Sequence, residues 1–227
     1  MSTPIYQWLA LGLAISLLGA PILLIAVRLK NVDPLGLPVR LTLWVLAGVV
    51  WGIAVLAGES WSRSLGLRVP GWHAVLGAAA ATFAVLPAWP LLQFIQRKAG
   101  GRLFAENVVF QKIVALPLAY RLFLIATAAV TEEILYRGFA IGIGQALLGN
   151  TPAAATLSVV IFTVTHFRWG LSHLLSVLWA ALAFTCLFVV TGDLLACIMA
   201  HAAIDTVGLV IAPALMAHRK TLTAPAA

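Results

Sequence analysis

Long apolar runs separated by short polar stretches dominate this sequence and leave it few possible folds. A membrane-spanning helix needs about 20 consecutive apolar residues, because that length crosses the hydrocarbon core of a bilayer. Of the 227 residues, 63% are hydrophobic and 9% are charged, whereas a soluble domain typically has about 25% charged residues. We therefore predict an integral membrane protein with an all-α fold, a polytopic transmembrane helix bundle of about seven spans. The expected spans cover residues 5–27, 41–57, 74–94, 117–147, 153–167, 171–190 and 194–214.

The basic residues indicate an orientation in the membrane and do not indicate nucleic-acid binding. The formal charge is +7, but most Lys and Arg residues lie at span ends rather than in a basic patch interleaved with aromatic residues. We therefore expect the lipid bilayer, and no nucleic acid, as a partner. With seven spans and the N-terminus outside, only Arg63 and Arg68 lie in outer loops, so the positive-inside rule favours a cytoplasmic C-terminus, and we expect a bacterial inner membrane. The inner loops and tail then hold Arg28, Lys30, Arg40, Arg97, Lys98, Arg102, Lys112, Arg168, Arg219 and Lys220.

Residues 131–138, read as Thr-Glu-Glu-Ile-Leu-Tyr-Arg-Gly, place two carboxylates and a guanidinium inside an apolar run. An ionised side chain at bilayer depth costs at least ~2.5–3.5 kcal/mol, so such charges indicate either function or ion pairing. Glu133 and Arg137 are four residues apart and share a helix face, where they can neutralise each other. Glu132 is rotated by roughly 100° onto another face, so local geometry leaves it without a partner.

Two later spans carry the remaining titratable groups near their middles or ends. Phe162 and His166 have helical i,i+4 spacing, so the aromatic ring can pack beside the imidazole, and His201 and Asp205 have the same spacing. A carboxylate and an imidazole can activate a water by accepting its proton and orienting it. A second imidazole facing the same cavity could stabilise the oxyanion formed when that water attacks a carbonyl. These groups together indicate peptide hydrolysis without a covalent intermediate.

Three motifs in this order resemble those of the CAAX protease and bacteriocin-processing family of intramembrane glutamic endopeptidases. They are Glu-Glu-x-x-x-Arg at residues 132–137, Phe-x-x-x-His at 162–166 and His-x-x-x-Asp at 201–205. The resemblance covers roughly residues 117–214. It implies a helix bundle around a polar, water-filled intramembrane cavity, in which a membrane-anchored peptide or protein substrate is cut.

The resemblance also implies roles for the motif residues. Glu132 would be the general base, working with His166 on the water, while His201 and the residue at position 205 would form the oxyanion site. Glu133 with Arg137 would hold the geometry. The prenyl-processing members have Asn at the last position. Asp205 can donate a hydrogen bond only if protonated; ionised, it would instead accept one from His201 and fix its tautomer, and we favour this second role.

On the basis of the expected spans and this resemblance, we divide the chain into three parts. Residues 1–114 are expected to form N-terminal spans and a surface connector, residues 115–216 a catalytic transmembrane core, and residues 217–227 a polar, frayed tail. In the first part, residues 58–72 are expected to be a solvated loop with Trp61 and Trp72 as interfacial anchors. In the second, Gly138 and Gly142 have the small-xxx-small spacing that lets a neighbouring helix approach closely.

Two alternative functions remain. A zinc-dependent protease could use Glu132, His166, His201 and Asp205 as a nitrogen and oxygen ligand set, but no His-Glu-x-x-His pattern is present. We expect no metal or other cofactor. A non-enzymatic membrane protein, such as a transporter, a chaperone or an immunity protein, could use the same residues as a polar packing core without turnover.

Overall fold

The computed structural model describes residues 3–60, 62–98, 100, 106–167 and 170–223, with the side chains of these residues except 171, 172 and 219–223. Trp61, Arg102 and Arg168, which entered the predictions above, lie outside this part, and the side chains of Arg219 and Lys220 do too. Every regular element that is described is helical, so the all-α prediction is confirmed. In chain order the α-helices before the first motif are α1 (Thr3–Leu29), α2 (Leu37–Leu56), α3 (Trp72–Val85), α4 (Trp89–Lys98), α5 (Val108–Val114) and α6 (Leu118–Glu133). They are followed by η3 (Ile134–Ile143), α7 (Gly144–Leu148), α8 (Thr151–Thr165), α9 (Leu171–Thr191), α10 (Leu194–Thr206), η5 (Val207–Ile211) and α11 (Ala212–Thr223).

Five helical segments are long and apolar enough to cross a bilayer, which makes the chain an integral membrane protein. Large apolar side chains such as Ile22, Phe83 and Val190 are exposed on the outside of the bundle, where lipid can cover them. Helix α8 is apolar but shorter, and seven spans stay a prediction. The five long segments are Thr3–Leu29, Leu37–Leu56, Trp72–Lys98, His173–Thr191 and Leu194–His218.

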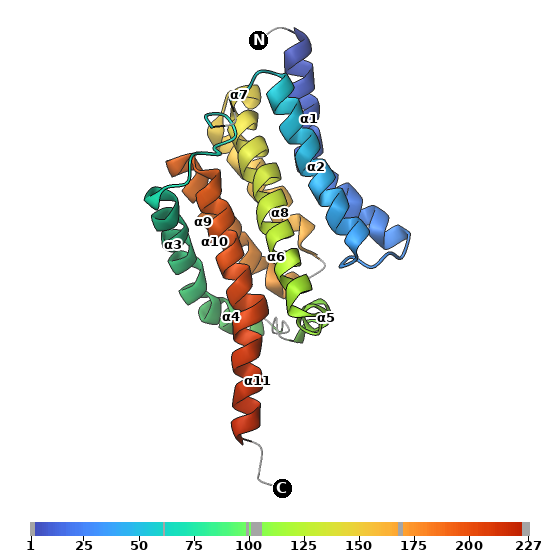
Figure 1. The fold of residues 1–227 in the computed structure, drawn as a ribbon, viewed down its shortest axis with the longest axis vertical. Helices are drawn as coiled ribbons and strands as arrows, with labels where there is room; N and C mark the ends of the chain where they lie inside the picture. The colour runs from blue at the N-terminus through green and yellow to red at the C-terminus, as the bar shows by residue number, and fades with distance from the viewer. Residues whose placement is uncertain (1–2, 61, 99, 101–105, 168–169, 224–227) are drawn as a thin grey trace.

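The helices pack into one bundle rather than into separate N-terminal and C-terminal bodies. Helices α1 and α2 run side by side along one flank, and α3 packs against α9 and α10 on the other (Figure 1). Leu9 of α1, Val50 of α2, Leu135 of η3 and Phe162 of α8 belong to one buried cluster. The first two helices therefore form part of the wall around the central elements, and the proposed division of the chain by function stays a prediction.

The central element is the continuous helical rod made by α6, η3 and α7. Its middle part, η3, is a π-helix in which residues 135–143 are all buried, and π-helical turns occur frequently at functional sites. Hydroxyls of neighbouring helices bind its carbonyl groups: Ser16 donates to Leu135, and Ser158 donates to Tyr136 at 2.6 Å. These contacts fix the rod that carries the first motif.

Polar caps and glycines set the ends of the helices near the site. The side chain of Asn150 accepts a hydrogen bond from the backbone at the start of α8, and Asp193 does the same for α10. Gly149 and Gly192, with φ of 64° and 60°, end α7 and α9 in the left-handed conformation that glycine favours. Local turn chemistry therefore decides where the chain reverses between α7 and α8 and between α9 and α10.

The segment between α2 and α3 differs from the solvated loop expected for residues 58–72. Its middle enters the bundle, where Leu65 is buried and the carbonyl of Gly66 accepts a hydrogen bond from Leu194 at 2.8 Å. A Cβ on Gly138 or Gly142 would meet the backbone of this loop. Because Gly138 and Gly142 have no side chain, the backbone of this loop can pack directly against the rod, in addition to side chains of neighbouring helices.

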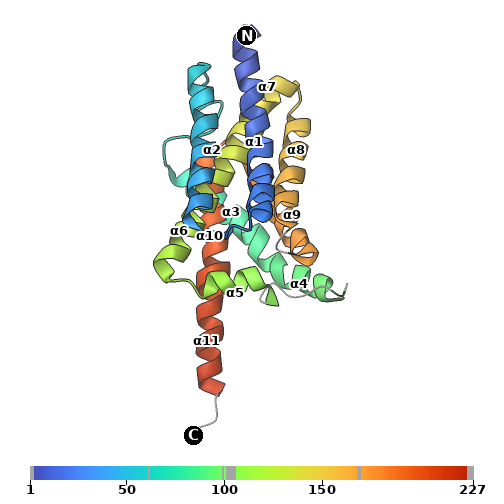
Figure 2. The same ribbon diagram turned by 90° about the vertical axis from the view of Figure 1, so that its right-hand side faces the viewer.

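The C-terminal helices α10, η5 and α11 form a long rod that extends beyond the other helices (Figure 2). The tail predicted to be frayed is helical as far as Thr223. Residues 214–222 contain no glycine or proline, so nothing in the local sequence interrupts the helix.

Candidate active site

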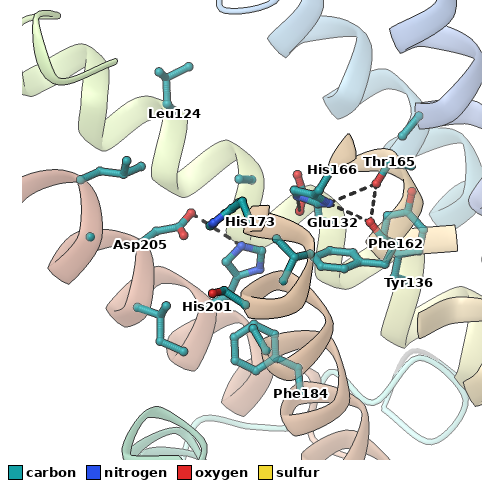
Figure 3. A pocket seen from close by; sticks show the side chains of 18 of the residues that line it. Leu124, Glu132, Tyr136, Phe162, Thr165, His166, His173, Phe184, His201 and Asp205 are labelled. Carbon is teal, nitrogen blue, oxygen red and sulfur yellow. Dashed lines mark hydrogen bonds and ion pairs between the residues drawn. The ribbon is translucent and has the colours of Figure 1, made fainter. Parts of the chain in front are cut away.

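A cavity of about 260 Å³ lies between the N-terminal helices and the motif-bearing helices. Residues of α1, α2, α4, α6, η3, α8, α9 and α10 line it. Figure 3 shows the polar groups that face it, among them Glu132, His166, His201 and Asp205. The structure thus brings four of the six predicted site residues to one cavity, although they lie on three separate segments of the chain.

Glu132 and His166 form an open pair in this cavity. Oε2 of Glu132 lies 3.9 Å from Nε2 of His166, which is too long for a hydrogen bond. The two side chains are 17% and 21% exposed and line the cavity, but the Oε2 atom of Glu132 is itself buried. Oε2 of Glu132 has no hydrogen-bond partner among the residues that the structure describes. The two atoms therefore face each other without a direct hydrogen bond.

The end of α8 fixes the ring of His166. The backbone N–H of His166 binds Thr163 rather than Phe162, so the Phe162 carbonyl remains available at the helix end. Nδ1 of His166 lies 2.7 Å from that carbonyl oxygen and 3.2 Å from Oγ1 of Thr165. A carbonyl can only accept a hydrogen bond, so Nδ1 carries the proton. Nε2, on the Glu132 side, is then an acceptor in the neutral ring.

Phe162 packs beside this imidazole, as its spacing predicts. The two ring centroids are 4.6 Å apart, and the Phe162 ring also makes an edge contact with Tyr136 at 5.2 Å. Cζ of Arg137 lies 4.6 Å from the centre of the same ring, within the range of a cation–π interaction. Phe162 therefore contacts both His166 and the buried ion pair described next.

Glu133, Arg137 and His201 form a closed network beside the cavity. Arg137 donates from Nη1 to Oε1 of Glu133 at 2.9 Å, which confirms the predicted i,i+4 pair. The same oxygen lies 2.8 Å from Nδ1 of His201 on α10. Arg137 also donates from Nη2 to the Ala181 carbonyl of α9 at 3.3 Å. Glu133 and Arg137 are fully buried, so this network joins three helices out of contact with solvent.

Asp205 does not make the hydrogen bond predicted for it. Its Oδ2 lies 3.6 Å from Nε2 of His201, within ion-pairing distance but beyond hydrogen-bonding distance. Glu133 holds Nδ1 of His201 instead and thereby sets the tautomer. The sequence could not reveal this contact, because Glu133 and His201 are 68 residues apart and meet only when α6 packs against α10.

Other residues that the sequence did not single out also line the cavity. Tyr136 follows Glu132 by one helical turn, and His173 of α9 faces the same space (Figure 3). Arg40, expected to be a charge at a span end, lines it as well. Tyr136 lies within the first motif, but no sequence signal could have assigned His173 or Arg40, which come from helices without a motif.

The possible metal ligands of the described part of the chain do not form a metal site. No three His, Cys, Asp or Glu side chains there converge in an arrangement that could hold a metal ion. The geometry instead supplies a carboxylate and an imidazole acceptor at one side of the cavity and a second imidazole, held by Glu133, at another. Such groups can accept a proton from water and stabilise developing negative charge.

Part of the chain matches a known family. Residues 114–207 match the family described as Type II CAAX prenyl endopeptidase Rce1-like. This segment contains all three motifs and runs from the end of α5 to the beginning of η5. No curated protein and no solved structure gives a significant match to the chain.

Proposed function

Because residues 114–207 of this chain are a domain of the Rce1-like type II CAAX prenyl endopeptidase family, we propose that the protein is an intramembrane endopeptidase of the glutamic type. Its substrate is a membrane-associated peptide or protein, as the family membership suggests. The observation that carries the proposal is the open Glu132–His166 pair: a carboxylate oxygen without a partner in the described residues lies 3.9 Å from an imidazole nitrogen inside the cavity.

In the proposed reaction Glu132 is the general base. A water binds between Oε2 of Glu132 and Nε2 of His166, and Glu132 takes its proton as the water oxygen attacks the carbonyl carbon of the peptide bond. The same proton then passes to the nitrogen of the leaving fragment as the C–N bond breaks. One water is consumed, and a new carboxyl group and a new amine are formed. Such proton transfer by a positioned side chain typically contributes about 10²–10⁴-fold in rate.

His201 is proposed to stabilise the tetrahedral intermediate. In its imidazolium form it donates from Nδ1 to Glu133 and from Nε2 to the oxyanion. The 2.8 Å contact with Glu133 supports this role, because it aims the opposite nitrogen of the ring toward the cavity. Asp205, 3.6 Å from that nitrogen, acts through His201 by balancing its charge.

Glu133 and Arg137 are proposed to support the site without touching the substrate. Both are fully buried and do not line the cavity. Their pairing keeps the carboxylate that orients His201 in place, and the contact of Arg137 with the Ala181 carbonyl ties the network to α9. These contacts hold the side chains in one arrangement, although Oε2 of Glu133 and Nε of Arg137 have no hydrogen-bond partner among the described residues.

We also propose that the cavity is water-filled at membrane depth and that the chain crosses a bacterial inner membrane seven times, with its N-terminus outside. The rod of α6, η3 and α7 and the apolar helix α8 are the two additional spans, since they run through the same bundle as the five long segments. The excess of basic residues at the inner span ends, loops and tail, against Arg63 and Arg68 outside, supports the orientation.

The test compares membrane proteomes of cells that express the wild-type protein or Glu132→Gln. We expect a membrane-associated protein to be shortened by the wild type and to accumulate uncleaved with the variant. Glu59→Gln, which changes a carboxylate in the loop between α2 and α3, is the matched control and should cleave like the wild type. A full set of cleaved products with Glu132→Gln would refute glutamic hydrolysis and favour a non-catalytic role for this carboxylate.

A second measurement separates the proposal from zinc chemistry. The purified protein should keep its activity on the identified substrate after treatment with a chelator. Loss of activity that Zn²⁺ restores would assign Glu132, His166, His201 and Asp205 to a metal site instead.

A further inference from the structure

Arg40 brings a cation from outside the family-matched segment into the cavity that holds Glu132. It lies in the first turn of α2 and lines the same space as Glu132 and His166. Trp44, one turn later on the same face of α2, donates from Nε1 to Oγ1 of Thr127 on α6 at 3.1 Å. This contact joins the face of α2 that carries Arg40 to the helix that carries Glu132.

The turn before α2 holds one end of the Arg40 guanidinium. Nη2 of Arg40 donates to the Pro34 carbonyl. The same turn is fixed by two further contacts: Tyr120 donates its hydroxyl proton to the Leu35 carbonyl at 2.7 Å, and the Leu35 N–H donates to Oδ1 of Asp33 at 3.0 Å. Arg40 is therefore positioned by backbone, and no carboxylate of the described residues forms an ion pair with it.

The guanidinium also has an N–H donor without a partner among the described residues. Nε of Arg40 is buried and makes no hydrogen bond to any residue described in the structure. Guanidinium presents five N–H donors in a planar fork, which matches the two oxygens of a carboxylate or phosphate. An anionic group is thus the ligand that this side chain is best suited to bind.

The rest of the cavity wall formed by α1, α2 and α4 is apolar. Leu23 and Leu24 of α1, Leu43 of α2 and Leu92 of α4 line it. An apolar chain would be stabilised against these side chains by the hydrophobic effect. Because the carboxylate of Glu132 repels a second anion, the anionic end of a ligand belongs at the α2 side of the cavity.

We propose that Arg40 is an anion-binding site of this cavity, which takes a carboxylate or phosphate group attached to an apolar chain. The C-terminal carboxylate of an apolar peptide and the phosphate of a single-chain lipid share this chemistry. Binding at Arg40 needs no bond to be broken, so the proposal can hold or fail independently of the proposed hydrolysis.

The experiment measures binding to the purified full-length Glu132→Gln protein in detergent, where no turnover is expected. The probes are N-acetyl-trileucine as free acid and as amide, and lysophosphatidic acid with the monoacylglycerol of the same chain length. We expect one anionic probe to bind at least about tenfold more tightly than its neutral counterpart, as a charge-assisted, bidentate contact implies. The probe that shows the preference identifies the source of the anion.

Adding Arg40→Gln should abolish this preference and leave the affinity for the neutral probe unchanged. Arg40→Lys, which keeps the charge but not the fork, should retain part of the preference and serves as the second variant if Arg40→Gln does not fold. Arg121→Gln is the matched control, because Arg121 also donates to a backbone carbonyl, that of Leu209 at 3.0 Å, and does not line the cavity. Equal affinity for anionic and neutral probes, no binding of either anion, or an equal loss for both kinds of probe in Arg40→Gln would each overturn the proposal.

Discussion

Two adjacent carboxylates end α6, and each faces a histidine, but the two pairs are built in opposite ways. Glu133 is fully buried, and one of its oxygens lies 2.8 Å from His201 and 2.9 Å from Arg137. Glu132 is 17% exposed and lies 3.9 Å from His166. The closed pair has short contacts that hold its groups, whereas the two side chains of the open pair make no hydrogen bond to each other.

The different surroundings of Glu132 and Glu133 follow from helix geometry and show how two adjacent residues can have different roles. Consecutive residues on a helix point about 100° apart, so one carboxylate faces α10 and the other faces the cavity. A buried charge must be paired to be tolerated, and Glu133 meets this condition with Arg137. Both contacts of Glu133 are to Oε1, whereas Oε2 of Glu132 makes no hydrogen bond to the described residues.

The largest effect is expected from Glu132→Gln, which removes the base of the open pair. Activity should fall about 10²–10⁴-fold, the usual contribution of general-base catalysis. The thermal unfolding temperature should change little, because Oε2 of Glu132 makes no hydrogen bond to the described residues. Turnover of the identified substrate and thermal unfolding in detergent measure the two quantities. A variant that unfolds far below the wild type while retaining its turnover would reverse the roles of the two pairs.

Glu133→Gln should affect stability more than any other single change in the site. It leaves the buried guanidinium of Arg137 without its counter-charge, which costs about 3–5 kcal/mol. The unfolding temperature should drop strongly, and activity should fall as His201 loses its partner. The double variant Glu133→Gln, Arg137→Gln should recover part of the lost stability. Wild-type unfolding of the single variant would show that the closed pair is not the structural one.

Phe162→Leu tests the ring that contacts both pairs. Its loss removes the contacts with Arg137 and His166, each at 4.6 Å, and a cation–π contact contributes about 0.5–2 kcal/mol. Stability should fall by a similar amount, and activity should fall a few-fold in parallel. Phe83→Leu, a lipid-facing change on α3, is the control that should leave both unchanged. A change in only one quantity would show that the pairs are independent of this ring.

The smallest effect is expected from Thr165→Val, which removes a hydroxyl that donates to the Phe162 carbonyl at 2.6 Å and lies beside His166 of the open pair. It removes the hydroxyl 3.2 Å from Nδ1 of His166, and a single hydrogen bond contributes about 0.5–1.5 kcal/mol. Activity should fall roughly 2–10-fold on that scale, while the unfolding temperature stays near the wild-type value. Thr165→Ser keeps the hydroxyl and should restore turnover. Equal activity of the Val and Ser variants would contradict this prediction and would show that the Phe162 carbonyl alone is enough to orient His166.

Much of the site could be predicted from residue spacing because its parts are local. The Glu133–Arg137 pair and the Phe162–His166 contact both join residues four apart on one helix, where geometry brings side chains together whatever the rest of the fold does. The order of the three motifs likewise indicated the family that matches residues 114–207.

The solvent-exposed loop predicted between α2 and α3 shows where such reasoning ends. Its composition is polar at both ends, but Leu65 and Gly66 are buried because Gly138 and Gly142 on the rod leave space for them. A pattern within one segment cannot reveal the shape of the surface that another segment presents.

The sequence by itself determined that this chain is a membrane-embedded helical protein, that Glu133 pairs with Arg137, and that three motifs recur in a known order. Tertiary structure alone decided that Glu133 rather than Asp205 holds Nδ1 of His201, and that Arg40 lines the cavity. The physical reason is range: helix geometry dictates contacts within about one turn, whereas contacts between distant helices depend on how complete side-chain surfaces pack.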